Sequence, residues 1–408
     1  MEFFKIVSLK EAKEKVMQSE YRLDLSTERI SISESLNRYA SKAVQASLLL
    51  PPFSRSTVDG YAVAVQDVMG ASESIPAMLT LGKEIRMGQT AGELLEIGEA
   101  VYVPTGGMVP ENAEGVVMIE YTEKLDDETV LIQKPLAYGE NIINKGDDLK
   151  PGDVLIEEGE RISGRDMGMI AGAGISEVDA FVPIKVAIFS TGDEIIDCDV
   201  ASKDGEIYDI NGYALKGEVE RLGCRVISKE IIKDNFDRLR AGVEKALGEA
   251  DLIMLSGGSS VGTRDFTQAV IDSFEDGELL FHGISIKPGK PTMVGKIGKK
   301  LVFCLPGHPT ASALVFQELV KPYILSAFHS TQSGLEVHAA ITENLHAAPG
   351  KDNFIPVELI SDEKGFRAKP LLGKSGLFSI MADASGYIHL SSEMEGVMAG
   401  EDVRVKIL

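Results

Sequence analysis

The sequence lacks long apolar runs and has little cysteine, and both absences exclude classes of protein. No run approaches the roughly 18 apolar residues that a membrane-spanning helix needs, so we expect no membrane partner. The cysteines, Cys198, Cys224 and Cys304, are widely scattered, which favours a reducing cytoplasm over a disulfide framework. The first five residues, MEFFK, have neither a basic start nor a long apolar core, so we expect no secretory signal.

Several catalytic and architectural signatures are also missing. The six histidines lie far apart, and none belongs to a Cys/His cluster with zinc-binding spacing, which argues against a structural zinc site. No Gly-x-Ser-x-Gly elbow is present, so a Ser-His-Asp hydrolase has little support. We find no internal repeat at periods of about 20–50 residues and no low-complexity tract.

The charge balance is strongly acidic. Lys and Arg number 41 against 63 Asp and Glu, and the formal net charge of −22 argues against nucleic-acid and anionic-membrane partners. Hydrophobic residues at 44% and charged residues at 25% are ordinary globular values, and 408 residues allow roughly two to four domains. A net charge of this size still leaves room for a local basic pocket.

The first 180 residues combine short helices with a β-rich stretch. Ser8 and Glu11 form a capping-box pattern that predicts a helix through about residue 18. A second helix is expected over residues 34–46, before a Pro-Pro pair that cannot continue it. Apolar runs separated by Gly, Asn and Asp predict a β-rich domain over residues 53–138. The strands expected here and just beyond are 100–103, 115–119, 129–132 and 152–156, with a short helix after Ser163.

Residues 181–328 alternate apolar strands with helices, which indicates a doubly wound parallel sheet. The strand runs lack polar alternation, so we expect the sheet to be covered on both faces. Residues 329–408 hold no long helical pattern, and their short alternating runs predict a small β barrel. The strands expected in the α/β part are 184–189, 225–227, 251–255 and 301–305, and the helices are 211–222, 236–247, 265–274 and 309–328.

Two loops at the carboxyl ends of these strands are candidate ligand sites, because open α/β sheets bind ligands there. Residues 190–194 (STGDE) fit either a site for a polar ligand or divalent cation, or an acidic turn that caps a helix. Residues 256–265 (SGGSSVGTRD) place three glycines and several hydroxyls before a helix, which predicts phosphate binding better than a plain turn. Asp265 is either a helix cap or a ligand to a metal that neutralises this phosphate.

Two further segments lie beside the same edge. Residues 286–291 (IKPGKP) hold Lys287 and Lys290 in a stretch stiffened by prolines. Two lysines usually mark a solvated turn, but in a chain this acidic we interpret them as an anion clamp. Residues 305–309 (LPGHP) form a tight strand-to-helix turn in which His308 fits a plain surface position.

The segment 51–63 (PPFSRSTVDGYAV) resembles the signature of the molybdopterin molybdenumtransferase family, which includes the MoeA proteins and the matching domain of gephyrin. Residues 104–113 (PTGGMVPENA) and 139–148 (GENIINKGDD) are similar to the family's next motifs. The resemblance covers essentially the whole chain, because four further segments follow in the family's order: 190–194, 256–265, 287–291 and 305–309.

The resemblance implies a multidomain α/β plus β fold that forms a homodimer. The inserted domain of one subunit would face the α/β domain of the other across the active-site cleft. The implied domains are a discontinuous N-terminal linker domain (1–52 and 139–180), an inserted β-rich domain (53–138), a MogA-like doubly wound α/β domain that binds molybdopterin (181–328), and a C-terminal β barrel (329–408).

The resemblance also implies an activity. Molybdate would be inserted into adenylylated molybdopterin with release of AMP, the last general step of molybdenum cofactor biosynthesis. The implied cofactor is a divalent cation, usually Mg²⁺, and a molybdopterin adenylyltransferase is the expected source of the substrate. Such substrates are densely anionic, so lysines and helix N-termini bind them directly whereas carboxylates do so only through a metal.

The motif positions carry the family's functional residues over to this chain. Glu194 and Asp265 are expected to bind the metal and handle phosphate, and Lys287 and Lys290 to hold molybdate or phosphate. Asp59 and Thr105 are expected to act from the partner's inserted domain. Asp148 and Asp234 fit either substrate binding or ordinary solvated turns. The other substrate-binding candidates, on the phosphate loop and the strand-to-helix turn, are Ser256, Gly257, Gly258, Gly262, Pro306 and Gly307.

The sequence departs from the common family pattern at four positions. Arg55 and Val58 stand where Asn and Met are frequent, Ser259 where Val is usual, and His308 where Asn is usual. Arg55 and His308 are therefore candidates for shifting the preference between molybdate and tungstate. Two alternative functions stay open. A molybdopterin adenylyltransferase has a similar Gly-Gly loop but does not need the β-rich flanks, and the retained acids and lysines argue against a non-catalytic scaffold.

Overall fold

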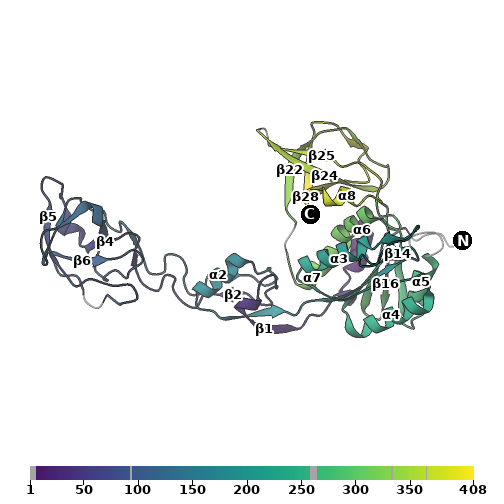
Figure 1. Ribbon diagram of the computed structural model, residues 1–408, viewed down its shortest axis with the longest axis horizontal. Coiled ribbons are helices and arrows are strands. Elements are labelled where there is room, and N and C mark those ends of the chain that lie inside the picture. Colours follow the sequence, from purple (N-terminus) through teal and green to yellow (C-terminus); the bar gives the residue numbers. More distant parts are fainter. Residues whose placement is uncertain (1–5, 92–93, 258–263, 332–333, 364) are drawn as a thin grey trace.

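The computed structural model describes residues 6–91, 94–257, 264–331, 334–363 and 365–408. In Figure 1 these residues form an elongated molecule, with a β-rich distal lobe at one end and a slender middle unit next to it. The other end holds an α/β unit, with a small barrel packed beside it. The predicted boundaries between the domains stay predictions.

The distal lobe is built on a mixed β-sheet. A Cβ atom at Gly60 would overlap the carbonyl oxygen of Val117 on the neighbouring strand, so only glycine fits at this position. The predicted strands at 100–103, 115–119 and 129–132 are confirmed. In sheet order the strands are β7 (Gly115–Met118), β4 (Gly60–Val63), β6 (Glu99–Val103), β5 (Ala77–Leu81), β9 (Thr129–Ile132) and β8 (Thr122–Lys124).

The middle unit pairs segments that precede the distal lobe with segments that follow it. Its helix α2 (Gly164–Gly172) begins after Ser163, as the sequence predicts, and Ser163 forms a capping box with Asp166. The antiparallel pairs are β1 (Thr27–Ser31) with β12 (Glu177–Phe181) and β2 (Val44–Gln45) with β11 (Val154–Ile156). A third pair, β3 (Arg55–Ser56) with β10 (Ile142–Ile143), belongs to the distal lobe, where Ser56 N donates to the Gly107 carbonyl at 3.0 Å. The chain therefore passes through the middle unit twice, once before and once after the distal lobe (Figure 1).

The helix predicted over residues 34–46 is wrong. Between the end of a 3₁₀ turn (Ile32–Glu34) and strand β2, this stretch consists of turns and two isolated β-bridges, at Tyr39 and Ala40. Asn37 has a φ of 65°, which no right-handed helix contains, and its N–H group donates to the Ile162 carbonyl at 2.9 Å. Pairing with residues distant in sequence therefore overrides the local helix preference.

The α/β unit contains a mixed sheet with helices on both faces. The four apolar strands are parallel as predicted. Strand β20 (Met293–Ile297) runs antiparallel to both of its neighbours, β21 (Lys300–Leu305) and β18 (Gly277–His282), so the expectation of a parallel sheet is wrong at this edge. Both β18 and β20 contain glycine and charged residues, which interrupt the apolar pattern from which we predicted the other strands. The sheet order is β16 (Arg225–Ile232), β13 (Lys185–Thr191), β17 (Leu252–Gly257), β21 (Lys300–Leu305), β20 (Met293–Ile297) and β18 (Gly277–His282), and the helices include α3 (Ile210–Arg221), α4 (Phe236–Glu249) and α5 (Arg264–Asp272).

The helix predicted over residues 309–328 is present in three consecutive parts. They are α6 (Pro309–Val315), the π-helical turn η5 (Phe316–Val320) and α7 (Lys321–Ala327). Pro322 has no N–H group to donate to the preceding turn, and the π turn ends two residues before it, at Val320. Neither this helix nor any other within the described ranges is long and apolar enough to cross a membrane.

Glu318, in the π turn, joins three parts of the molecule. Its buried carboxylate accepts hydrogen bonds from Lys13 Nζ at 2.6 Å, Lys406 Nζ at 2.6 Å and Tyr387 Oη at 2.7 Å. Lys13 belongs to α1 (Leu9–Val16), which begins with the predicted capping box of Ser8 and Glu11. The other two partners belong to the barrel.

The C-terminal unit is the predicted small barrel. Its ring runs through β24 (Asp352–Asp362), β25 (Gly365–Pro370), β22 (Glu336–Ile341), β28 (Asp402–Ile407) and β26 (Gly386–Leu390), and β26 pairs back with β24 to close it. The short strand β19 (Ile286–Lys287), which follows β18 in the chain, adds to this barrel parallel to β24. The barrel also contains the helix α8 (Ser379–Ala382), which contacts α6.

Candidate active site

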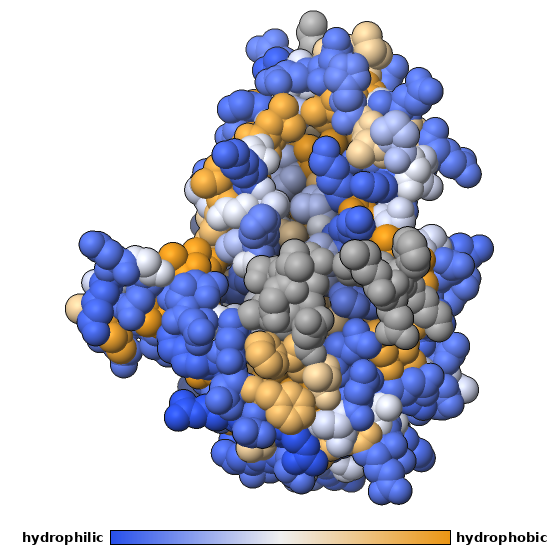
Figure 2. Space-filling model, turned by 90° about the vertical axis from the view of Figure 1, so that its right-hand side faces the viewer, coloured by the Kyte–Doolittle hydropathy of each residue, from blue (hydrophilic) through white to orange (hydrophobic). Residues whose placement is uncertain are grey.

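Two cavities open where the α/β unit meets the barrel. Figure 2 views this end of the molecule and shows the surface hollowed between the barrel above and the α/β unit below. One cavity, of about 470 Å³, lies at the carboxyl ends of β13 and β17, and we name it the carboxylate cavity after Glu194 and Asp234 in its lining. The other, of about 860 Å³, is lined by Lys287 and Lys290, and we name it the lysine cavity.

The predicted site residues of the α/β unit gather around these cavities. The carboxylate cavity is lined by Glu194, Asp234, Ser256, Gly257 and Gly307, and the lysine cavity by Lys287, Lys290 and Pro306. Gly258 and Gly262 lie outside the described residues. Asp265 is part of α5, and its side chain also lies outside the described part.

The end of β17 forms one wall of the carboxylate cavity. Ser256 is buried, and Gly257 follows it with a φ of 111°. A Cβ atom at Gly257 would overlap the carbonyl oxygen of Thr191, so no other residue fits this position without strain. The absence of a side chain leaves the backbone of residue 257 as the lining of the cavity, which is the arrangement that phosphate-binding turns use.

Glu194 and Asp234 bring carboxylate groups to this cavity. Glu194 is exposed, and Asp234 is half-buried at the end of β16. Burial raises the pKa of Asp234 above its usual value, and the nearby charges of Asp193 and Glu194 raise it further. A bound cation would relieve this repulsion, so the donors suit a divalent metal. Among the described residues, however, no three His, Cys, Asp or Glu side chains are grouped to hold one, so this pair supplies only part of a ligand set.

Asp209 and Asn211, which we did not predict as site residues, organise the same cavity. The buried carboxylate of Asp209 accepts a hydrogen bond from Ser190 Oγ at 2.8 Å. Asn211 Nδ2 donates to Ser256 Oγ at 2.7 Å and to the Gly307 carbonyl at 2.9 Å, so it ties the turn after β17 to the turn after β21. An Asp-x-Asn pattern at the start of a predicted helix was the available signal, but such a pattern also suits an ordinary cap.

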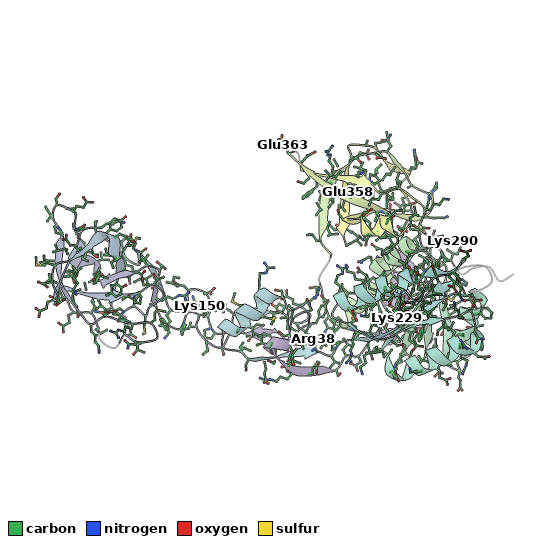
Figure 3. All side chains as sticks on the ribbon, in the orientation of Figure 1. Arg38, Lys150, Lys229, Lys290, Glu358 and Glu363 are labelled. Atoms are coloured by element: carbon green, nitrogen blue, oxygen red, sulfur yellow. The ribbon has the colours of Figure 1, made fainter. Side chains whose placement is uncertain are left out.

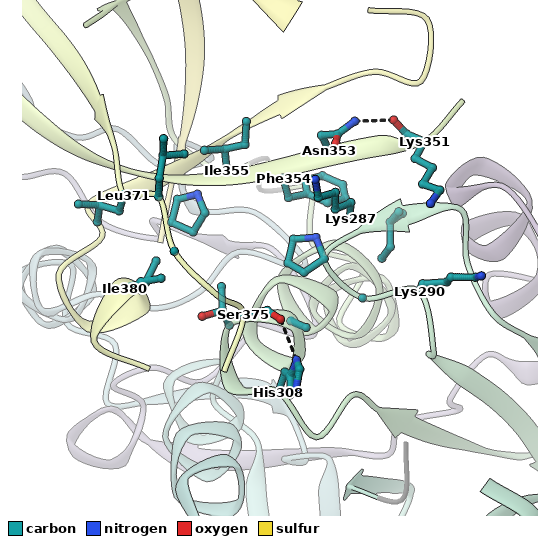
Figure 4. Close-up of a pocket in the computed structure, with 18 of the residues that line it drawn as sticks. Lys287, Lys290, His308, Lys351, Asn353, Phe354, Ile355, Leu371, Ser375 and Ile380 are labelled. Carbon is teal, nitrogen blue, oxygen red and sulfur yellow. Dashed lines mark hydrogen bonds between the residues drawn. The ribbon is translucent and has the colours of Figure 1, made fainter. Parts of the chain in front are cut away.

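Lys287 and Lys290 line the lysine cavity from the two ends of a tight turn (Figure 4). Gly289, between them, has a φ of 118°, and a Cβ atom there would lie 2.7 Å from buried apolar side chains. Both lysine side chains are exposed, and Figure 3 shows Lys290 at the junction of the barrel and the α/β unit. The turn therefore presents two ammonium groups in a backbone conformation that glycine makes possible.

The opposite wall of the lysine cavity comes from the barrel, and we did not predict it. Lys351 adds a third ammonium group on this side, as Figure 4 shows. The apolar part of the wall includes Phe354, Ile355, Leu371 and Ile380. A cationic rim beside an apolar wall suits an anion attached to, or bound beside, a flat organic group.

Three predicted site residues lie outside both cavities. In the distal lobe, Asp59 Oδ1 accepts a hydrogen bond from Thr105 N at 2.8 Å, so the structure brings these two residues together. Asp148 is exposed, and Lys150, two residues further along, lies at the neck of the distal lobe in Figure 3. Because the distal lobe occupies the far end of the molecule (Figure 1), these residues do not meet the cavities of the same chain.

Comparison with known protein families gives matches along most of the chain. Residues 7–174 match the MoeA N-terminal region, described as domains I and II. Residues 187–326 match a domain described as a probable molybdopterin binding domain. Residues 338–408 match the MoeA C-terminal region, described as domain IV.

Individual relatives agree with these matches. A relative from Methanocaldococcus jannaschii is 33% identical over 387 residues, which cover 93% of this chain and 92% of that protein. The molybdopterin molybdenumtransferase of Haemophilus influenzae is 31% identical over 405 residues, which cover 98% of each. The crystal structure of a molybdopterin biosynthesis MoeA protein from Pyrococcus horikoshii matches with a TM-score of 0.80 at 35% identity, covering 99% of both chains. The chain described here therefore belongs to the MoeA family.

Proposed function

We propose that this protein inserts molybdate into adenylylated molybdopterin and releases AMP. Membership of the MoeA family supports a role in molybdenum cofactor biosynthesis, and the H. influenzae relative is named for the transferase activity. The observation that carries the proposal is the adjacency of two unlike cavities. One combines carboxylates with a glycine turn, and the other combines lysines with an apolar wall.

The carboxylate cavity is proposed to hold the phosphoanhydride of the adenylylated substrate. Ser256 and the backbone at Gly257 would contact its phosphate oxygens. Glu194, together with Asp265, would hold Mg²⁺, which would offset the negative charge of the phosphoanhydride when it is bound. Asn211 would keep the two turns that border this cavity at a fixed separation, because it donates hydrogen bonds to both.

The lysine cavity is proposed to hold molybdate, a dianion, between Lys287 and Lys290. Compact ammonium groups suit a tetrahedral oxyanion, since they make no demand on planar geometry. The apolar barrel wall would contact the ring system of the pterin. Each Mo–S bond to the dithiolene would replace a Mo–O bond of molybdate, whose oxygen would leave as water, and water would cleave the phosphoanhydride to release AMP. The reaction therefore needs substrate groups from both cavities within reach of each other.

Asp59, Thr105 and Asp148 are proposed to act on the cavities of a partner subunit in a homodimer. The distance of the distal lobe from the cavities of its own chain supports this assignment (Figure 1). The contact between Asp59 and Thr105 supports their joint action. Delivery of the substrate by a molybdopterin adenylyltransferase and a cytoplasmic location belong to the same proposal.

The test is to supply adenylylated molybdopterin, molybdate and Mg²⁺ to the purified protein and to measure AMP and molybdenum cofactor. Both products are expected to rise together. Glu194→Ala is expected to reduce the rate at least about 100-fold without unfolding the protein. The control is Glu244→Ala, on the exposed face of α4, which is expected to keep the wild-type rate.

Two results would contradict the proposal. The first is the absence of AMP release with the wild-type protein. The second is adenylylation of molybdopterin that requires ATP as the sole activity, which would make the protein an adenylyltransferase. Full activity of Glu194→Ala would remove Glu194 from the mechanism but leave the proposed reaction in place.

A further inference from the structure

A segment of the barrel stands between the two cavities. Ser375 lines the lysine cavity, and the next residue, Gly376, lines the carboxylate cavity. His308, at the start of α6, lines both. We name residues 373–377 the partition, because consecutive residues of this segment face different cavities.

Hydrogen bonds to the first residues of α6 hold the partition in place. Thr310 N donates to the Ser375 carbonyl at 3.2 Å, and Thr310 Oγ1 donates to the Leu377 carbonyl at 3.0 Å. His308 Nδ1 and Ser375 Oγ are hydrogen-bonded at 2.7 Å, which is the dashed line between these two residues in Figure 4. The contact joins residues 67 positions apart in the sequence.

These bonds take the place of an ordinary helix cap. An N-cap side chain usually accepts a hydrogen bond from an N–H group of the first turn. In the part of the chain that the structure describes, the side chain of His308 makes no such bond to its own helix. The Thr310 N–H group, which has no carbonyl partner within α6, is satisfied by Ser375 instead. Displacement of the partition therefore leaves the start of α6 uncapped.

We propose that His308 is a positioning residue that holds the partition closed and thereby couples ligand binding in the two cavities. This inference rests on the proposed function, which puts the adenylyl group in the carboxylate cavity and the oxyanion in the lysine cavity. A ligand in either cavity packs against one face of the partition and favours the same closed position. Each ligand therefore increases the affinity for the other, by the same factor in both directions.

The experiment measures molybdate binding to the full chain by equilibrium dialysis, with and without saturating AMP and Mg²⁺. In the wild-type protein AMP is expected to lower the dissociation constant of molybdate by about five- to tenfold. Of the described hydrogen bonds that hold the partition, His308→Ala leaves only the two from Thr310, and this ratio is expected to fall toward 1, whatever the change in either affinity alone. Ser375→Ala is expected to give the same loss, and the double variant no further loss, because both remove one hydrogen bond.

Two further variants separate coupling from folding. Glu393→Ala changes an exposed barrel residue outside both cavities and is expected to keep the wild-type ratio. His308→Asn supplies a side chain that caps α6 well but is too short to hold Ser375 in the same place. It is expected to unfold at the wild-type temperature and still to lose the coupling.

The possible results distinguish failure of the coupling from failure of the proposed molybdate-insertion function. Retention of the wild-type ratio by a folded His308→Ala or His308→Asn protein overturns the role of His308. A wild-type protein that binds AMP and molybdate independently of each other overturns the coupling. A wild-type protein that binds neither ligand overturns the proposed function, and the coupling with it.

Discussion

Replacing Glu318 by glutamine tests what holds the barrel and α1 to the α/β unit. Burial opposes a charge on this carboxylate, but Lys13 and Lys406 outweigh burial and lower its pKa from 4.5 to about 2. At about 1.4 kcal/mol for each pH unit, this difference corresponds to about 3 kcal/mol of stability at neutral pH. The two lysine side chains are 35% and 33% exposed and can be hydrated after the substitution, so we expect a loss of about 2–3 kcal/mol, below the ~3–5 kcal/mol of a fully buried pair.

The pH dependence of this loss has a definite sign. Since the pKa of Glu318 is lower in the folded chain, the unfolded chain binds more protons between about pH 2 and pH 4.5. The stability that the carboxylate adds is fully present above pH 4.5 and is lost as the pH falls toward 2. Glutamine takes up no proton, so the deficit of Glu318→Gln relative to wild type is expected to shrink through this window.

Urea unfolding at pH 7 and at about pH 3 measures both the loss of stability and its pH dependence. Urea is uncharged, so it does not screen the ion pairs. The matched control is Glu244→Gln, whose carboxylate forms an exposed pair with Arg240 at 3.0 Å and is expected to matter by less than about 0.5 kcal/mol. A Glu318→Gln protein as stable as this control at pH 7 would refute the reasoning. An equal deficit at both pH values would refute the role of the charge.

Three further substitutions probe the cavities. Gly257→Ala is expected to lower the thermal unfolding temperature, because the φ of 111° and the adjacent Thr191 carbonyl exclude a Cβ atom. The control is Gly248→Ala in α4, whose added Cβ atom meets no described atom within 4 Å and which is expected to raise the unfolding temperature. The opposite order of the two unfolding temperatures would contradict the backbone argument. Asn211→Ala is expected to weaken AMP binding about tenfold by calorimetry, and an unchanged affinity would show that the tie between the turns is dispensable. Lys287→Ala is expected to weaken molybdate binding about tenfold and to reduce its salt dependence, whereas Lys299→Ala, at the other end of the sheet, should match wild type.

The parts of the fold that the sequence predicted have strong local signals. Capping boxes at Ser8 and Ser163 mark helix starts, and uninterrupted apolar runs mark the parallel strands, because both depend on neighbouring residues alone. Strands β18 and β20 were missed because glycine and charged residues break their apolar pattern. The error at residues 34–46 has a different origin, since a backbone hydrogen bond such as that from Asn37 N to the Ile162 carbonyl leaves no signal in the local sequence.

The residues of the candidate site likewise fall into those that the sequence could predict and those that it could not. Ser256 lies at the carboxyl end of β17, and Glu194 and Gly307 follow the ends of the neighbouring strands β13 and β21, so parallel topology brings these positions to one edge. The barrel side of the lysine cavity was not predictable, because Lys351 and Ser375 reach it only through the docking of one unit on another. A short polar loop in a β-rich stretch carries no signal for such a contact.

The addition of β19 to the barrel determines how the two cavities respond to movement. Ile286 pairs with Asp352 and Lys287 with Asn353, so the backbone that carries the first lysine belongs to the same ladder as the apolar wall facing it. A tilt of the barrel would carry Lys287 along and leave its distance to that wall nearly constant. The separation that changes is the one from Lys287 to Glu194, which stays with β13 on the α/β unit. The relative orientation of the two units therefore sets the distance from Lys287 to Glu194. Lys287 and the β24 part of the apolar wall move together, while the α6 side of the lysine cavity, which includes Thr310, stays with the α/β unit.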